Sequence, residues 1–165
     1  MLSAQSDYFT LFGLAKTFTQ DVTAIKARFY QLQQKIHPDK YVSISEKRAA
    51  VALSSTINEA YQVLCSPLKR ALYLLKLHGI DVQSETDTAM PIDFLMEQIA
   101  FRERLADKEG QSLKDDVDAK LKACENTLSQ YLDKEEVSAD LPQARLIVRQ
   151  MLFYARLIQE YDENL

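Results

Sequence analysis

The tripeptide His37-Pro38-Asp39 is the segment of this 165-residue chain whose residue types and spacing could do chemistry. Pro38 restricts the backbone, so we expect His37 and Asp39 to project from a stiff corner. The Asp39 carboxylate can accept a charge-assisted hydrogen bond from an arginine, and the His37 imidazole can donate or accept one. The loop offers His37 no candidate nucleophile, so the pattern favours contact with another molecule over nucleophilic catalysis.

Two amphipathic helices must position this corner. Asp21 is a good N-cap for the first, which must end before Pro38 because a proline disfavours the helical conformation of the residue before it. Its apolar stripe consists of Ile25, Phe29, Leu32 and Ile36. The second helix is expected to begin around Ser45, and its apolar stripe consists of Leu53, Ile57, Ala60, Tyr61 and Leu64. Matching stripes on consecutive helices predict an antiparallel hairpin with the tripeptide at its tip.

The remaining elements are also predicted to be helices. Residues 7–14 form a short first helix, and Ser66-Pro67 begins another that Gly79 ends. Polar residues 80–91 are the candidate linker. Three long helices follow at about 91–109, 112–134 and 139–162, and short connections between them predict an antiparallel three-helix bundle. On the last helix the expected buried stripe is Ile147, Met151, Ala155 and Ile158, with Leu152 and Phe153 off it.

Composition supports an all-α chain. Three glycines and four prolines are far fewer than a sheet protein with many turns uses. No glycine-rich phosphate loop is present, and two histidines with the separated cysteines Cys65 and Cys124 make a zinc site improbable. Both cysteines lie on apolar stripes, so reduced core thiols are favoured over one disulfide. No apolar run is long enough for a membrane span, and we expect a cytoplasmic protein without cofactor or metal.

Charge is distributed unevenly along the chain. Residues 1–76 carry ten Lys or Arg against five Asp or Glu, and residues 77–165 carry ten against nineteen. This asymmetry predicts two modules with different partners. The basic excess is modest and lacks an aromatic-rich basic strand, so neither nucleic acid nor membrane is an expected partner.

The first bundle helix carries more apolar surface than packing requires. Phe94, Phe101 and Leu105 share one face, which suffices for docking in a bundle. Leu95, Met96 and Ile99 form a second stripe, rotated by about 100–200° from Phe94. The second stripe is either buried under the N-terminal module or exposed as a binding patch.

The N-terminal half resembles the J-domain, the module with which co-chaperones engage heat-shock ATPase chaperones. The resemblance rests on D-Y-F-T-L-F-G-L, on the tripeptide and on the two flanking helices, and it covers about residues 7–76. It implies that His37, Pro38 and Asp39 contact the chaperone and stimulate its ATP hydrolysis. It also implies that the basic residues around the tip dock on an acidic chaperone surface; these are Lys26, Arg28, Lys35 and Lys40.

A closer resemblance spans nearly the whole chain. The segments F-L-M-E-Q-I and S-P-L-K-R-A-L-Y-L-L-K-L-H-G look like the HscB family of iron–sulfur cluster assembly. Membership implies a J-domain at 1–79, a linker at 80–91 and a three-helix bundle at 92–165, packed in an L shape. The bundle of that family binds the cluster scaffold protein IscU and delivers it to the chaperone HscA. The positions implied for scaffold contact are Leu95, Met96, Ile99, Glu103, Asp107 and Phe153.

Two other functions remain as alternatives. One is a general J-protein that serves a housekeeping DnaK-type chaperone. The other is a small helical hydrolase, which the sequence disfavours because His78 adjoins the helix-ending Gly79, where helix capping is its expected role. The acidic pairs Asp115/Asp116 and Glu135/Glu136 are typical of solvated helix surface, so we expect no enzymatic activity.

Overall fold

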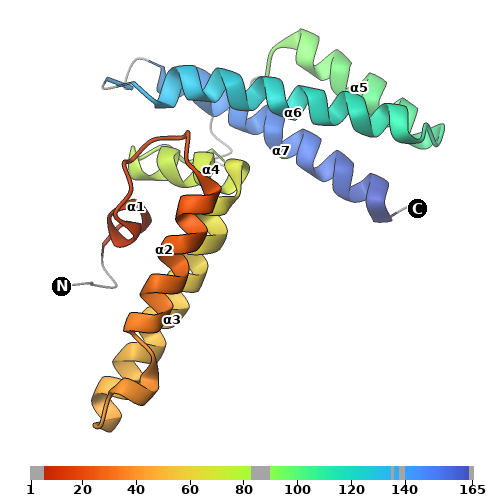
Figure 1. Cartoon of the computed structure of the whole chain (residues 1–165). Coiled ribbons are helices and arrows are strands. Elements are labelled where there is room, and N and C mark those ends of the chain that lie inside the picture. The colour runs from red at the N-terminus through yellow and green to blue at the C-terminus, as the bar shows by residue number, and fades with distance from the viewer. Residues whose placement is uncertain (1–5, 83–89, 135, 138–139, 164–165) are drawn as a thin grey trace. The chain divides into compact units, whose positions relative to one another are not determined.

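The computed structural model describes residues 6–82, 90–134, 136–137 and 140–163. The chain divides into two compact units, Met1–Leu74 and Leu75–Leu165. Over the described residues it forms seven α-helices and one short 3-10 helix without any strand, so the predicted all-α class is confirmed (Figure 1). Residues 83–89 of the expected linker lie outside the described residues.

The first unit is built on a helical hairpin. Helices α2 (Val22–Lys35) and α3 (Ile44–Cys65) run antiparallel, and the 3-10 helix η1 (Pro38–Lys40) lies at the free end of the hairpin (Figure 1). The short helix α1 (Tyr8–Phe12) contacts both, and α4 (Pro67–Leu77) begins in this unit. The predicted stripes form its core, since Ile25, Leu32, Ile36, Ile57, Ala60 and Leu64 are buried.

Capping residues set where these helices begin and end. Asp7 and Asp21 accept backbone hydrogen bonds at the starts of α1 and α2, as N-caps do. Helix α3 begins at Ile44, slightly before the predicted position, because Ser43 and Glu46 form a reciprocal capping box. Helix α4 ends where predicted, with Gly79 at a φ of 76°.

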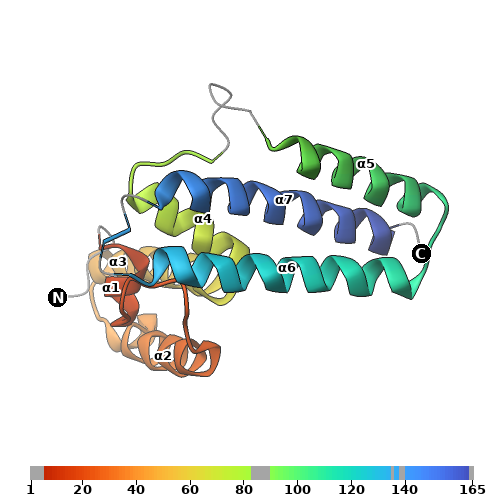
Figure 2. The ribbon, with the colours of Figure 1, turned by 90° about the horizontal axis from the view of Figure 1, so that it is seen from above.

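The second unit is a three-helix bundle. It consists of α5 (Ile92–Ala106), α6 (Gln111–Leu132) and α7 (Leu141–Glu163). Figure 2 shows α6 and α7 side by side along most of their length, with α5 lying along α7. The buried side chains from α5 and α6 are Phe94, Phe101, Leu113, Val117, Cys124, Leu128 and Leu132. Cys65 and Cys124 are both free thiols, but only Cys124 lies in the core, since Cys65 is half-buried.

Two details of the bundle differ from expectation. Helix α5 ends at Ala106 rather than near Glu109, because Lys108 adopts a φ of 55° and closes the helix with backbone hydrogen bonds from Lys108 and Glu109 to the last turn. The buried face of α7 also differs from the stripe predicted for this helix. It consists of Ala144, Val148, Met151, Tyr154 and Leu157. Of the stripe predicted for this helix, only Met151 is fully buried.

Candidate functional site

The tripeptide forms an exposed corner at the hairpin tip. Ile36 caps α2, and the backbone N–H of Lys40 donates to the His37 carbonyl at 3.0 Å, which closes η1. The His37 and Asp39 side chains remain 59% and 90% exposed. The Pro38 side chain lies outside what the structure describes.

The two polar side chains of the corner are already oriented toward each other. The His37 Nδ1 atom accepts a hydrogen bond from the Asp39 backbone N–H at 3.3 Å and lies 3.5 Å from the Asp39 Oδ2 atom. With Nδ1 as an acceptor, the proton of a neutral imidazole is on Nε2, where it can be donated outward. The Asp39 carboxylate keeps acceptor capacity for a partner arginine. The corner therefore offers one donor and one acceptor to another molecule.

Polar and aromatic contacts hold the two hairpin helices in register. The Gln33 side chain on α2 accepts from Ser54 at 3.1 Å and donates to Asn58 at 3.0 Å, both on α3. The rings of Phe29 and Tyr61 stack at 4.4 Å between centroids. These contacts fix the end of α2, from which the tip projects.

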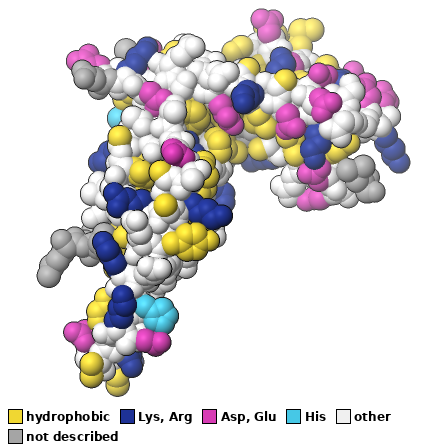
Figure 3. Space-filling model, viewed as in Figure 1, with side chains coloured by type: hydrophobic (Ala, Val, Ile, Leu, Met, Phe, Trp, Pro, Cys, Tyr) yellow, Lys and Arg dark blue, Asp and Glu magenta, His cyan; other side chains and the backbone are white. Residues whose placement is uncertain are grey.

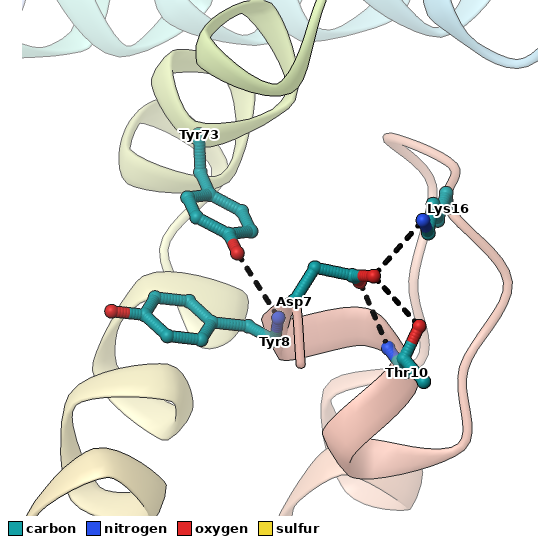
Figure 4. Close-up of polar contacts among 5 residues, drawn as sticks. All are labelled: Asp7, Tyr8, Thr10, Lys16 and Tyr73. Carbon is teal, nitrogen blue, oxygen red and sulfur yellow. Dashed lines mark hydrogen bonds and ion pairs between the residues drawn. The ribbon is translucent and has the colours of Figure 1, made fainter. Parts of the chain in front are cut away.

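The base of the hairpin is tied to α1 and α4 (Figure 4). The rings of Tyr8 and Tyr73 stack at 4.4 Å, and the Tyr8 backbone N–H donates to the Tyr73 hydroxyl at 3.1 Å. Asp7 accepts from the Thr10 backbone at 3.0 Å and from Lys16 at 2.9 Å. Partial burial raises the pKa of Asp7, but the hydrogen bonds from Thr10 and Lys16 outweigh it and lower the pKa to about 2. Asp7 is therefore ionised at neutral pH and anchors α1.

Arg70 is a buried cation that no sequence pattern indicated. Its Nε donates to the Leu64 carbonyl at 2.8 Å, and its Nη1 donates to the Phe18 carbonyl at 2.6 Å. The guanidinium thereby caps the end of α3 and pins the loop between α1 and α2. Only a tertiary contact can reveal this role, because Phe18 lies far from Arg70 in the sequence.

The basic residues expected to help chaperone docking are all exposed, but they do not form one cluster. At about 100° per residue, Lys26 lies about 180–200° around α2 from Arg28 and Lys35. Arg28 and Lys35 line a hollow of about 270 Å³ between α1 and α2, where Arg28 donates to Gln31 at 3.3 Å. Lys40 lies at the tip itself. A flat partner surface can therefore meet Lys26 or the Arg28–Lys35 side, but not both.

The second apolar stripe of α5 is exposed. Met96 and Ile99 are 64% and 60% exposed, and Leu95 is also exposed. Ile92 was not among the residues predicted for this stripe, but it is exposed and extends the stripe. These four residues share one side of α5 with the exposed Glu103, opposite the buried Phe94 and Phe101. We call Ile92, Leu95, Met96 and Ile99 the α5 patch.

Phe153 lies on α7, apart from the α5 patch. Its half-buried ring packs edge-on against Phe94 at 5.7 Å, and the Arg102 guanidinium lies 5.7 Å from the ring centroid. Asp107 is exposed at the end of α5. Phe153 therefore packs against two side chains of α5, while part of its own surface remains accessible.

A polar cluster of Glu97, Lys120 and Tyr154 joins the three bundle helices. Glu97 accepts hydrogen bonds from Lys120 at 2.7 Å and from the Tyr154 hydroxyl. Burial raises the pKa of Glu97, but these two donors outweigh it and lower that pKa. Burial and Glu97 both raise the pKa of Tyr154. Glu97 is therefore ionised and Tyr154 neutral at physiological pH.

The same three residues line a cavity of about 320 Å³. Cys124 also lines it, and burial, together with Glu97, raises the pKa of this thiol to about 11, so it stays protonated. Among the described residues, no group of His, Cys, Asp and Glu side chains is placed to hold a metal ion. Over the same residues, no helix is long and apolar enough to cross a membrane.

Comparison with known proteins identifies both units. The family model described as the DnaJ domain matches residues 7–73, and the model described as the HSCB C-terminal oligomerisation domain matches residues 90–162. The fold and the exposed His37 and Asp39 side chains at the hairpin tip define a J-domain co-chaperone. A co-chaperone protein HscB homolog from Azoarcus sp. is 34% identical over 99% of this chain and 96% of its own length. The chain belongs to the HscB co-chaperone family.

Other relatives agree with this assignment. A co-chaperone protein HscB homolog from Ralstonia nicotianae is 49% identical over 109 residues, which span 65% of this chain and 62% of that protein. The chain in the crystal structure of human co-chaperone protein HscB is 31% identical in sequence and superimposes with a TM-score of 0.88. The match covers 98% of this chain and 83% of the human chain. The chaperone HscB from Vibrio cholerae is 30% identical with a TM-score of 0.79, covering 96% and 97%.

Proposed function

We propose that this co-chaperone binds an IscU-type iron–sulfur cluster scaffold protein, brings it to an HscA-type ATPase chaperone and raises the rate at which that chaperone hydrolyses ATP. Residues 1–79 engage the chaperone, and residues 92–165 hold the scaffold. The scaffold is thus captured as ATP is hydrolysed, and this aids the maturation of iron–sulfur proteins.

The observation that carries the proposal is the exposed corner at the hairpin tip. The His37 imidazole and the Asp39 carboxylate are both exposed to solvent, on a backbone held by η1 and by the cap of α2. Asp39 offers a carboxylate to a chaperone arginine, and His37 offers a donor beside it. Four exposed basic residues supply a positive field that speeds the encounter with an acidic chaperone surface and weakens as salt rises: Lys26, Arg28, Lys35 and Lys40.

The α5 patch supports the scaffold half of the proposal. Leu95, Met96 and Ile99 are exposed in a chain that already has a complete bundle core, so their apolar surface is available to another protein. Part of the Phe153 surface is accessible on the neighbouring helix α7, and Glu103 and Asp107 supply carboxylates on α5. Full burial of an aliphatic or aromatic side chain contributes about 1.5–3 kcal/mol. Association costs about 4–15 kcal/mol, so the expected complex is micromolar and can be released.

An ATPase assay with purified HscA-type chaperone and scaffold tests the proposal. His37→Gln should abolish stimulation of ATP hydrolysis and leave scaffold binding unchanged, because the tip and the α5 patch belong to different units. His78→Gln is the matched control, since His78 is also exposed but lies at the end of α4. If His37→Gln stimulates as well as the wild-type protein does, the proposed mechanism is wrong.

The same assay distinguishes the two kinds of chaperone partner. Stimulation of an HscA-type chaperone that increases further when scaffold is added supports delivery. Equal stimulation of a DnaK-type chaperone, with no effect of scaffold, would instead support a general J-protein.

A further inference from the structure

Three large apolar side chains at the beginning of α3 face solvent. Val42 is 93% exposed, Ile44 is 73% exposed and Val51 is 57% exposed. Figure 3 shows hydrophobic side chains gathered at the free end of the hairpin, next to a histidine and to charged groups. We call Val42, Ile44 and Val51 the α3 entry surface.

These side chains have no evident role in the fold. Val42 directly precedes the N-cap Ser43, where an apolar residue usually packs against the fourth helical residue. That residue is Lys47, which is exposed, so this packing is not made. Ile44 occupies the first helical position and also points to solvent. Two neighbouring apolar side chains left in water offer apolar area that a partner can bury.

The capping box holds this surface in a fixed geometry. The Ser43 hydroxyl accepts from the Glu46 backbone at 3.1 Å, and the Glu46 carboxylate accepts from the Ser43 backbone at 3.3 Å. Ile44 and Val51 are seven residues apart in α3, so they share one face about 10 Å apart. The exposed Lys47 and Arg48 lie beside them on the same helix. The surface is therefore an ordered apolar strip with a basic rim.

The strip is continuous with the tripeptide tip. Asp39 and Val42 are three positions apart in the sequence, so their Cα atoms lie at most about 11 Å apart. A standard protein interface covers about 800 Å² on each partner, which is wide enough to include both. We propose that the α3 entry surface docks in an apolar recess on the same ATPase chaperone that the tip engages, with chaperone carboxylates facing Lys47 and Arg48. This inference rests on the proposed function.

Titration of the chaperone's ATPase with the full-length co-chaperone tests the inference. Val42→Thr combined with Ile44→Thr keeps the branching at Cβ but replaces one methyl group of Val42 and the ethyl group of Ile44 with hydroxyls. We expect the concentration that gives half-maximal stimulation to rise about tenfold. We expect the maximal stimulation to stay unchanged, because His37 and Asp39 are intact. Val22→Thr is the matched control, since Val22 is also exposed at the first position of a helix, about 20 Å along α2 from the tip.

Running His37→Gln in parallel separates the two proposals. If His37→Gln stimulates like wild type, the proposed function fails. If His37→Gln is inactive but the double variant gives the wild-type titration curve, the proposed function stands and the α3 entry surface inference is wrong. Sedimentation velocity tests whether a second copy of this chain binds the α3 entry surface instead. A dimer that forms with the wild-type protein but not with the double variant would show that it does, and the inference would be wrong. Unchanged helical circular dichroism in the double variant ensures that any loss reports on docking.

Discussion

The Tyr154 hydroxyl on α7 donates a hydrogen bond to the partly buried Glu97 carboxylate on α5. Glu97 lies next to Met96 in sequence but faces the other helices, whereas Met96 faces solvent. Lys120 on α6 donates to the same carboxylate at 2.7 Å. One side chain of α5 is thus held by both neighbouring helices, and this fixes the rotation of α5 that turns the α5 patch outward.

Tyr154→Phe should weaken this attachment without disturbing the packing of the ring. The phenyl ring keeps its edge-on contacts with Phe94 and Phe101, but Glu97 loses one of its two donors. Loss of a hydrogen bond to a charged group costs about 1.5–3 kcal/mol. We expect the free energy of unfolding in urea to fall by about that amount and scaffold affinity to fall a few-fold. Tyr161→Phe on the same helix is the control and should change stability by less than about 0.5 kcal/mol.

The lowered pKa of Asp7 predicts that the folded chain loses stability in acid. Its pKa of about 2 in the folded chain lies below the ordinary value of 3.8. As the pH falls from 3.8 towards 2, the unfolded chain therefore binds a proton more readily than the folded chain does, and stability is lost. Urea unfolding of wild type and Asp7→Asn should show wild type as more stable at pH 7, with the difference shrinking across this range. A difference that stays constant down to pH 2 would contradict the role given to the charge.

Replacing Arg70 should lower the free energy of unfolding at neutral pH. Arg70→Met keeps an unbranched side chain of similar reach but leaves the carbonyls of Leu64 and Phe18 without this donor. We expect a loss of about 3 kcal/mol in the free energy of unfolding, because each of the two hydrogen bonds from this charged donor contributes about 1.5–3 kcal/mol. Lys69→Met is the control at the neighbouring exposed position. Similar stability of both variants would show that the Arg70 contacts are dispensable.

Local signals made the hairpin and its tip predictable. Asp21 and Pro38 act on their immediate neighbours, so they mark the start and stop of α2 without knowledge of the rest of the chain. The stripe containing Ile57 and Leu64 has a single apolar face, so its burial followed from helical periodicity.

Features that depend on distant partners were not predictable. Helix α7 has apolar residues on adjacent stripes, so periodicity left its rotation open and favoured Ile147 over Val148. Tyr154 can be buried because its hydroxyl meets Glu97, 57 residues away. Whether Leu95 and Met96 were covered or exposed likewise depended on packing that no local pattern encodes.

The α5 patch provides the last prediction. Leu95→Ala, Met96→Ala and Ile99→Ala together should weaken binding of the scaffold protein more than tenfold in calorimetry, because these side chains supply apolar area that only a partner can bury. Alanine is a good helix former, so the helical circular-dichroism signal should remain. Phe153→Ala belongs in a separate variant, since its ring also contacts Phe94 and its loss should reduce stability too. Val51→Ala, an exposed apolar position in the other unit, is the matched control and should bind scaffold as wild type does. Unfolding of the triple variant would show that these residues are core, and unchanged affinity would place the scaffold site elsewhere on the bundle.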